Sequence, residues 1–424
     1  MVTQHKRHVA LVSVHGDPAI DIGKEEAGGQ NVYVRQVGEA LARLGWQVDM
    51  FTRRTSTEQQ QIVNHAPHCR TIRLTAGPAT FVPRDEIFSY LPDFVSELCR
   101  FQAESNYGYG LVHTNYWLSS WVGMELKARQ PGLQQVHTYH SLGAVKYQAV
   151  EVIPPIASTR LEVEKRCLET ADCVVATSPQ EQEHMRSLVS SRGNIAIIPC
   201  GTDIRRFGCI RRLDARAALG LDEEEKVVFY IGRFDPRKGI ETLVRAVSQS
   251  ALRGQTKLKL VIGGGSRPGQ SDGRERDRIE SIVADLGLTD ITLFPGRISD
   301  EDLPVYYAAA DVCVVPSHYE PFGLVAIEAM ASGTPVVASN VGGLQFTVAN
   351  EETGLLAPAR DEASFAIAID RILKDSARRD QMGQAARRRV EQYFSWDGVA
   401  AQLDQLYLDL LKSRVTAELN PSVA

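Results

Sequence analysis

Two short motifs in the C-terminal half of the chain place charged side chains next to turns, a pattern that suits a phosphorylated ligand. The first runs Gly232-Arg-Phe-Asp-Pro-Arg-Lys-Gly239 and follows an apolar run at 227–231. The second runs Glu320-Pro-Phe-Gly-Leu-Val-Ala-Ile-Glu328 and holds two carboxylates eight residues apart. Arginine and lysine bind a diphosphate through charge-assisted hydrogen bonds, and a carboxylate accepts hydrogen bonds from sugar or ribose hydroxyls.

In the first motif, Arg233 and Lys238 are the candidate phosphate ligands. Fixed cations stabilise the negative charge that grows on a diphosphate as it leaves. The alternative is a solvated loop after a strand, where arginine and lysine are common. The motif does not match the phosphate-binding pattern G-x-x-x-x-G-K-[ST].

In the second motif, the turn at 321–323 should precede a helix that continues through Met330. Free N–H groups at the start of a helix suit phosphate or sugar hydroxyls. Glu320 should lie in the turn and Glu328 about one turn into the helix. Two carboxylates at this spacing are usually surface charges, but the full pattern E-P-F-G-L-x-x-x-E is more specific and favours a ligand site.

The N-terminal half carries two further candidates next to predicted strands. Gly28 and Gly29 lie between an apolar run at 9–14 and an amphipathic helix. There the backbone can approach a phosphate, and the helix dipole favours the anion. His140 follows a predicted strand at 136–139, at the carboxyl end where α/β sheets bind ligands. A lone histidine is more often structural than catalytic. Its position at a strand end, next to Ser141, makes the two roles about equally favoured, so the residues alone leave its role open.

These motifs need a scaffold, which the hydrophobic pattern indicates. Strand-like apolar runs alternate with helical patterns, which predicts doubly wound parallel sheets. At 424 residues the chain is too long for one ordinary core. We therefore predict an α/β protein with two Rossmann-like domains. The predicted parts are a first domain at 1–204, a polar linker at 205–225, a second domain at 226–394, and a C-terminal crossing helix and tail at 395–424.

The composition narrows the classes of function. The formal net charge of −5 argues against a nucleic-acid-binding protein, which would carry a basic excess. No apolar run approaches the length of a membrane span. The apolar run at 9–14 is short and ends in polar residues, so it predicts a strand rather than a signal peptide. Seven cysteines without a C-x-x-C pair predict reduced thiols and a cytoplasmic protein.

Together, the two C-terminal motifs resemble the donor site of the retaining nucleotide-sugar glycosyltransferases of the GT-B fold. The resemblance extends from the first strand to Phe394-Ser-Trp396. It implies two Rossmann-like domains facing across a cleft, with a C-terminal helix that crosses back to the first domain. It also implies that Arg233 and Lys238 hold the diphosphate and that Glu328 accepts from the ribose.

The remaining roles follow from the same resemblance. His140 lines the reacting centre and orients the donor sugar, while Gly29 and Gln30 border the donor and the acceptor. The donor sugar is held by Glu320 and by the backbone of a turn made of Phe322, Gly323 and Leu324. The acceptor phosphate is expected to meet cations and hydroxyls from separate loops, namely Arg84, Tyr116, Ser141, Lys146 and Arg160.

Within this fold the chain resembles two groups: the sucrose-phosphate synthases and the mycothiol-pathway enzyme that glycosylates inositol phosphate. The segment 81–95 and His140-Ser-Leu-Gly143 are similar to the synthases, and Ser141 is the sucrose-type residue. Arg84 stands where lysine is usual, which preserves the charge. The segments Ala144-Val-Lys146 and Val341-Gly-Gly-Leu344 are similar to the mycothiol enzyme. We favour the synthase, which transfers glucose from UDP-glucose, or from ADP-glucose, to fructose 6-phosphate with retention.

The resemblance also implies how the reaction proceeds and what it needs. The leaving diphosphate takes the acceptor's proton in a front-face displacement, and no cofactor or metal site is expected, although Mg²⁺ could stimulate by binding the nucleotide. We expect no appended phosphatase domain, so a separate phosphatase is needed downstream of sucrose 6-phosphate. Nucleic-acid and membrane partners are not expected.

Two other classes stay open at this point. One is a phospholipid glycosyltransferase at a membrane surface, for which the basic stretch Arg387-Arg-Arg389 is a candidate contact, although a solvated helix face is the favoured interpretation of that stretch. The other is a non-catalytic sensor of nucleotide sugars.

Overall fold

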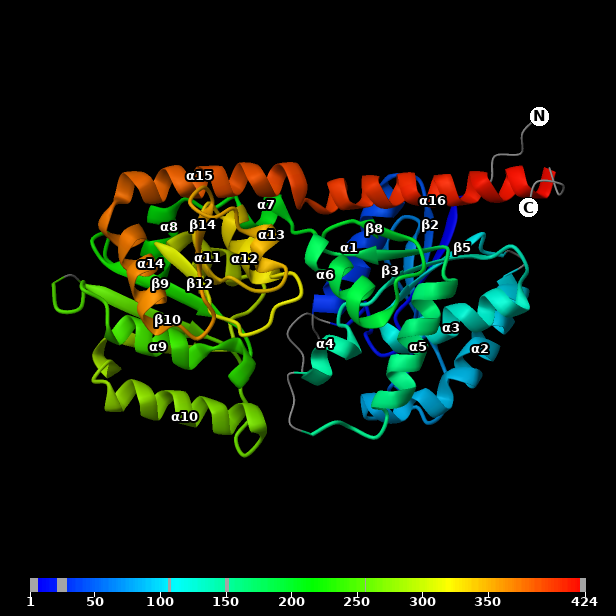
Figure 1. Ribbon diagram of the computed structural model, residues 1–424, viewed down its shortest axis with the longest axis horizontal. Coiled ribbons are helices and arrows are strands. Elements are labelled where there is room, and N and C mark those ends of the chain that lie inside the picture. Colours follow the sequence, from blue (N-terminus) through cyan, green and yellow to red (C-terminus); the bar gives the residue numbers. More distant parts are fainter. Residues whose placement is uncertain (1–6, 21–28, 106–107, 149–151, 256, 420–424) are drawn as a thin grey trace. The chain divides into compact units, whose positions relative to one another are not determined.

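The computed structural model describes residues 7–20, 29–105, 108–148, 152–255 and 257–419 (Figure 1). The chain forms two compact units. Unit 1 comprises residues 1–199 and 396–424, and unit 2 comprises residues 200–395. Each unit is built on a largely parallel β-sheet with helices packed against it. The predicted α/β class with two Rossmann-like sheets is therefore confirmed.

Unit 1 contains an eight-stranded sheet in the order β3-β4-β2-β1-β5-β6-β7-β8. Its strands are β1 (His8–Val12), β2 (Gln47–Arg53), β3 (Ile62–Ala66), β4 (Cys69–Leu74), β5 (Leu111–Asn115), β6 (Gln134–Thr138), β7 (Cys173–Ala176) and β8 (Ile195–Ile197). All neighbouring pairs are parallel except β3 with β4, which are antiparallel. The strand order reverses between β1 and β5, the point where sheets of this kind bind ligands.

The main helices of unit 1 are α1 (Gly29–Arg43), α2 (Leu91–Ser105), α3 (Tyr116–Arg129), α5 (Ala157–Thr170) and α16 (Trp396–Leu419). Helix α1 buries Val34, Val37 and Leu41 at helical spacing and packs against α16. Shorter helices are η1 (Arg84–Tyr90), α4 (Gly143–Gln148), α6 (Pro179–His184) and η2 (Met185–Val189). The C-terminal helix α16 thus belongs to unit 1, although the whole of unit 2 precedes it in the chain (Figure 1).

Unit 2 contains a six-stranded parallel sheet in the order β11-β10-β9-β12-β13-β14. Its strands are β9 (Lys226–Ile231), β10 (Leu258–Gly263), β11 (Thr292–Gly296), β12 (Val312–Val315), β13 (Val336–Ser339) and β14 (Gly354–Ala357). Its helices are α7 (Ile204–Phe207), α8 (Arg212–Leu219), η3 (Pro236–Lys238), α9 (Ile240–Ser248), α10 (Ser271–Asp285), η4 (Thr289–Ile291), α11 (Leu303–Ala309), α12 (Leu324–Ala331), α13 (Leu344–Thr347), α14 (Glu362–Lys374) and α15 (Ser376–Tyr393). The segment 205–225, suggested by sequence as a linker, thus contains α8 and most of α7 and lies within unit 2.

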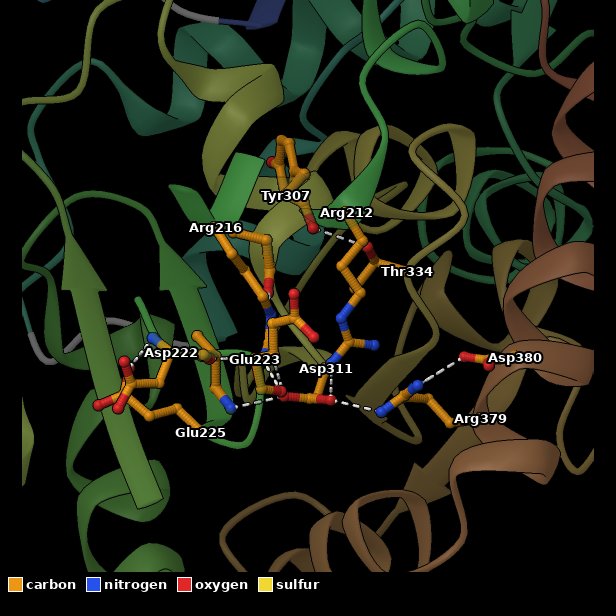
Figure 2. Close-up of polar contacts among 12 residues, drawn as sticks. Arg212, Arg216, Asp222, Glu223, Glu225, Tyr307, Asp311, Thr334, Arg379 and Asp380 are labelled. Atoms are coloured by element: carbon orange, nitrogen blue, oxygen red, sulfur yellow. Dashed lines mark hydrogen bonds and ion pairs between the residues drawn. The ribbon is translucent and has the colours of Figure 1, made fainter. Parts of the chain in front are cut away.

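The amino end of β12 is anchored by one buried carboxylate, that of Asp311 (Figure 2). Arg216 of α8 donates to its Oδ2 at 2.7 Å, and Arg379 of α15 donates to its Oδ1 at 2.6 Å. Arg212 forms a third ion pair, and the amide of Val227 donates to Oδ2 at 2.7 Å. Burial alone would raise the pKa of Asp311, but Arg212, the Val227 amide and Arg216 outweigh it and hold the pKa below its usual value. Asp311 therefore ties α8 and α15 to the sheet.

Within the described ranges, no group of three or more His, Cys, Asp or Glu side chains is placed to hold a metal ion. No helix in that part of the chain is both long and apolar enough to cross a membrane.

Candidate functional site

In unit 2, the two charged motifs meet at the carboxyl ends of the neighbouring strands β9 and β12. The amide of His318 donates to the carbonyl of Arg237 at 2.8 Å, which joins the two loops through their backbones. Gly239 has a φ of +69°, and a Cβ added there would lie 2.0 Å from the carbonyl oxygen of Pro316. The close approach of the loops therefore requires glycine at this position.

Lys238 and Glu320, one from each motif, form an ion pair. The Lys238 Nζ lies 2.6 Å from the Glu320 Oε2. Ser317 adds a hydrogen bond to the same carboxylate oxygen at 3.4 Å. Both charged side chains are partly exposed, at 29% for Lys238 and 16% for Glu320. The pair thus keeps a cation at the surface formed by the two strand ends.

Arg233 differs from the other cations of its motif. Arg237 is paired with Asp235, with Nη2 at 2.6 Å from Oδ2. The Arg233 side chain is exposed, and none of the described residues forms a hydrogen bond or ion pair with its guanidinium. Arg233 is therefore a cation whose hydrogen-bond donors are available to an anion.

The turn of the second motif is held by a second glycine-containing segment. Gly323 has a φ of +96° and immediately precedes α12, as the sequence predicted for a turn before a helix. The amide of Gly343 donates to the carbonyl of Glu320 at 2.9 Å. Phe322 is buried and packs edge-on against Phe394, with ring centroids 5.8 Å apart. The turn and the first residue of α12, Leu324, therefore have a fixed backbone.

Glu328 lies in the second turn of α12. The hydroxyl of Tyr307 on α11 donates to its Oε2 at 2.8 Å. Burial raises the pKa of Glu328 to about 7. The carboxylate is therefore close to half ionised at neutral pH. We call Arg233, Lys238, Glu320, Phe322, Gly323, Leu324 and Glu328 the unit 2 cluster.

In unit 1, His140 lies just beyond the carboxyl end of β6, beside the end of β5. Its Nε2 is 2.9 Å from Oδ1 of the buried Asn115, and its ring contacts Tyr33 edge-on at 4.8 Å between centroids. The backbone of His140 has a φ of +58°, in the left-handed region that few non-glycine residues adopt. Burial lowers the pKa of His140 to about 3, so the imidazole is neutral at physiological pH.

The contacts of Asn115 fix which nitrogen of His140 carries the proton. The Asn115 amide nitrogen donates to the carbonyls of Val12 at 3.4 Å and His113 at 3.3 Å. Its Oδ1 therefore faces His140 and can only accept a hydrogen bond. The proton of the neutral imidazole is accordingly assigned to Nε2, which leaves Nδ1 as a hydrogen-bond acceptor.

Two of the predicted acceptor residues lie against a third, Tyr116, which follows β5 directly. Arg84 at the start of η1 and Arg160 on α5 lie over the Tyr116 ring, with guanidinium carbons 5.6 and 5.0 Å from the ring centroid. The Tyr116 hydroxyl accepts a hydrogen bond from Nη1 of Arg160 at 3.2 Å. Tyr116 also has a positive φ, +72°.

Arg160 is almost fully buried, with only 1% of the residue exposed. Its Nε donates to Oε1 of the buried Glu164 at 2.7 Å, and its Nη2 donates to the carbonyl of Ser141 at 2.6 Å. Glu164 in turn accepts from the amide of Gly143 at 2.8 Å. Arg160 therefore also positions the loop that carries Ser141. Lys146 lies on the next helix, α4, and is half-buried.

Gly29 and Gln30 are the first two residues of α1. Gly29 is exposed, and the Gln30 amide donates to Ser13 Oγ at 2.9 Å, next to the end of β1. Gly28, predicted to open this helix, lies outside the described residues. We call Gly29, Gln30, Arg84, Tyr116, His140, Ser141, Lys146 and Arg160 the unit 1 cluster.

His15 is a member of this neighbourhood that the sequence reasoning missed. Its ring lies 4.5 Å from that of Tyr116, and its buried Nδ1 has no hydrogen-bond partner among the described residues. Burial, followed by the charges of Arg84, His140 and Arg160, lowers its pKa well below the usual value. Its place just after the first strand was a usable signal, because ligands bind at the carboxyl ends of such strands.

Known protein families match both units. Residues 28–201 match the family described as "Glycosyl transferase 4-like domain", and residues 212–389 match "Glycosyl transferases group 1". The unit 1 cluster lies within the first match and the unit 2 cluster within the second.

Individual relatives match along nearly the whole chain. A solved sucrose-phosphate synthase from Thermosynechococcus elongatus is 54% identical, with a TM-score of 0.86, over 96% of this chain and 100% of that one. The D-inositol 3-phosphate glycosyltransferase of Corynebacterium aurimucosum is 35% identical over 96% of this chain and 97% of its own length. That of Kineococcus radiotolerans is 36% identical over 96% of each. The chain therefore belongs to the group 1 glycosyltransferases, nucleotide-sugar-dependent hexosyltransferases with the GT-B fold.

Proposed function

We propose that this enzyme is a sucrose-phosphate synthase, which transfers glucose from UDP-glucose or ADP-glucose to fructose 6-phosphate and produces sucrose 6-phosphate. The observation that carries the proposal is the 54% identity, over 96% of the chain, to a protein with that name. The second candidate is transfer of N-acetylglucosamine to inositol phosphate, favoured by relatives named D-inositol 3-phosphate glycosyltransferase at 35% identity.

The unit 2 cluster is the proposed donor site. The guanidinium of Arg233 and the ammonium of Lys238 bind the diphosphate, and they stabilise the charge that develops when the glycosidic bond to the sugar breaks. Glu328 accepts hydrogen bonds from the ribose. Glu320 and the rigid 322–324 backbone hold the sugar.

The unit 1 cluster is the proposed acceptor site and supplies His140 to the reacting centre. Arg84, Lys146 and Arg160 provide positive charge for a phosphate dianion, and the hydroxyls of Tyr116 and Ser141 donate hydrogen bonds to it. Arg160 has five N–H donors. Three of them are used by Glu164, Tyr116 and the Ser141 carbonyl.

The proposed reaction is a front-face displacement with retention. The leaving diphosphate itself takes the proton from the acceptor hydroxyl. His140 orients the donor sugar by accepting a hydroxyl hydrogen bond at Nδ1. The positive charge for the leaving group comes from Arg233 and Lys238, so we propose that turnover persists after treatment with a metal chelator.

Product formation from defined substrates tests this proposal. One reaction contains UDP-glucose and fructose 6-phosphate, and a matched reaction contains ADP-glucose and the same acceptor. A third contains UDP-N-acetylglucosamine and inositol phosphate. Sucrose 6-phosphate in either of the first two supports the synthase. Product in the third alone would replace the synthase with the second candidate.

A further inference from the structure

Tyr307 makes a well-defined contact with Glu328 that none of the assigned roles uses. Its hydroxyl donates to Glu328 Oε2 at 2.8 Å, and the whole residue is buried. The ring packs edge-on against Phe229 and Phe207, with centroids 5.4 and 5.7 Å away. Its carbonyl accepts from Thr334 Oγ1 at 2.7 Å, a contact drawn in Figure 2. Tyr307 is therefore a fixed hydrogen-bond donor.

We propose that Tyr307 is a positioning residue for donor binding, which orients the Glu328 carboxylate and favours its ionised form. The inference rests on the proposed function, in which Glu328 accepts hydrogen bonds from the donor's ribose. An ionised carboxylate is acceptor-only, whereas a protonated one offers a donor and loses acceptor capacity. Ribose binding therefore depends on the charge of Glu328.

The groups around Glu328 act on its pKa in opposite directions. Among the described residues, Tyr307 alone donates a hydrogen bond to the carboxylate. Burial raises the pKa of Glu328 to about 7, whereas the Tyr307 hydrogen bond and the charge of Arg206 on α7 act to lower it, and Asp300 acts to raise it. Burial, with a smaller contribution from Glu328, raises the pKa of the nearby Cys313 thiol on β12, so that thiol stays neutral.

Helix α15 also packs against α12. Its Arg387 donates to the carbonyl of Ala331 at 3.3 Å, at the far end of α12 from the motif turn. Its guanidinium is also hydrogen-bonded to Gly208 at 2.7 Å and to Glu391 at 2.9 Å. The Tyr307 hydroxyl is thus the neighbour whose removal most directly disfavours the ionised form of Glu328.

The test compares Tyr307→Phe with Tyr306→Phe. Tyr306 is the adjacent residue of α11 and stacks on Phe229 at 5.7 Å, so it provides a matched loss of one hydroxyl. Binding of UDP alone is measured by calorimetry from pH 6 to pH 9. Ratios of affinity between variants at each pH cancel the ionisation of UDP itself, which all variants share.

Loss of a hydrogen bond to a charged group should raise the pKa of Glu328 by about one unit. Tyr307→Phe should then weaken UDP binding about fivefold at pH 7 and hardly at all at pH 9. The donor KM should rise while kcat stays near the wild-type value. Tyr306→Phe should match the wild type throughout.

Replacing Tyr307 by 3-fluorotyrosine keeps the hydroxyl and makes it a stronger donor, so it guards against a folding defect in Tyr307→Phe. This chain should bind UDP more tightly than the wild type below pH 7. A Tyr307→Phe defect that is equal at every pH, or no defect, overturns the inference.

Glu328→Gln distinguishes a failure of the proposed donor role of Glu328 from a failure of the role proposed for Tyr307. If Glu328→Gln binds UDP as the wild type does, the proposed donor role of Glu328 fails. If Glu328→Gln weakens binding but Tyr307→Phe does not, only the inference about Tyr307 fails. In the Glu328→Gln background, Tyr307→Phe should have no further pH-dependent effect, as a double-mutant cycle would show.

Discussion

The Nζ of Lys238 and the Oε2 of Glu320 lie 2.6 Å apart, although 82 residues separate them in the chain. The ion pair joins the loop after β9 to the loop after β12, at the same edge of the unit 2 sheet. Lys238, which we propose binds the diphosphate, and Glu320, which we propose binds the sugar, therefore hold each other in place. A change at either residue should affect both functions.

Lys238→Ala should reduce kcat by about 10²- to 10³-fold, because the charge on the leaving diphosphate loses a fixed cation. Stability should change by less than about 1 kcal/mol, because partly exposed ion pairs contribute little. The measurement is product formation together with a thermal melt. Lys257→Ala is a matched control, because Lys257 also pairs with a carboxylate in unit 2, Asp222 at 2.8 Å, and has no proposed role. Wild-type turnover in Lys238→Ala would contradict the donor assignment.

Asn115→Asp should make the activity sensitive to acid. A carboxylate beside His140 favours the imidazolium and raises its pKa from about 3. As pH falls through that raised pKa, Nδ1 becomes protonated and can no longer accept from the sugar. The kcat of the variant should therefore fall between pH 7 and pH 5 while the wild type changes little.

The matched control for this change is Asn194→Asp, at an exposed asparagine of unit 1 whose amide donates to Asp172. A shared pH profile for all three proteins would argue against the role assigned to His140 Nδ1.

Arg160→Ala should both destabilise unit 1 and raise the KM for the phosphorylated acceptor. Its removal leaves the buried Glu164 carboxylate without its cation, which typically costs about 3–5 kcal/mol. The double change Arg160→Met with Glu164→Leu should recover most of this stability, because it removes both buried charges. The acceptor KM should stay high in the double variant. If it returned to the wild-type value, Arg160 would have only a structural role.

Glu328→Gln should stabilise the protein at alkaline pH. Burial gives Glu328 a folded pKa of about 7, above its ordinary value of 4.5. The folded protein favours the protonated form of Glu328. The stability that this carboxyl contributes is fully present below pH 4.5 and is lost as pH rises through about 7. At pH 8 the free energy of unfolding of the amide variant should therefore exceed that of the wild type by about 1–3 kcal/mol, after allowing for partial solvent access. The variant should accordingly unfold at a higher temperature. At pH 4.5 the two melts should nearly coincide.

Much of the architecture could be predicted from sequence, because apolar strands that are buried on both faces leave a strong pattern. The strands at β9, β10 and β12 are of this kind. The hairpin of β3 and β4 was not predicted. Strand β3 is half-exposed and interrupted by polar Asn64 and His65, and its pairing begins at a tight turn in which His68 has a φ of +66°. Such an edge strand has no continuous apolar signal.

The candidate site was predictable only where residue type and position at a strand end coincided. The motifs around Lys238 and Glu320 met that condition. Tyr307, the hydrogen-bond partner of Glu328, did not, because the two residues are 21 residues apart on different helices. The contact of Asn115 with His140 likewise depends on β5 and β6 being neighbours in the sheet. Glu164 does follow Arg160 at the i,i+4 spacing of a helical ion pair, but spacing alone does not reveal its burial.

The return of α16 to unit 1 has a consequence for how the chain folds during synthesis. Unit 2 is continuous and can form its core as soon as it has been translated, whereas unit 1 lacks a packed face until 396–419 has been made. The hydroxyl of Tyr407 on α16 forms a hydrogen bond with Nδ1 of His113, in the middle of the unit 1 sheet, at 2.5 Å. The indole N–H of Trp46 donates to Oδ1 of Asp404 at 2.7 Å. Unit 1 can therefore complete its core only after α16 has been made, and an incomplete domain of this kind exposes apolar surface that favours aggregation.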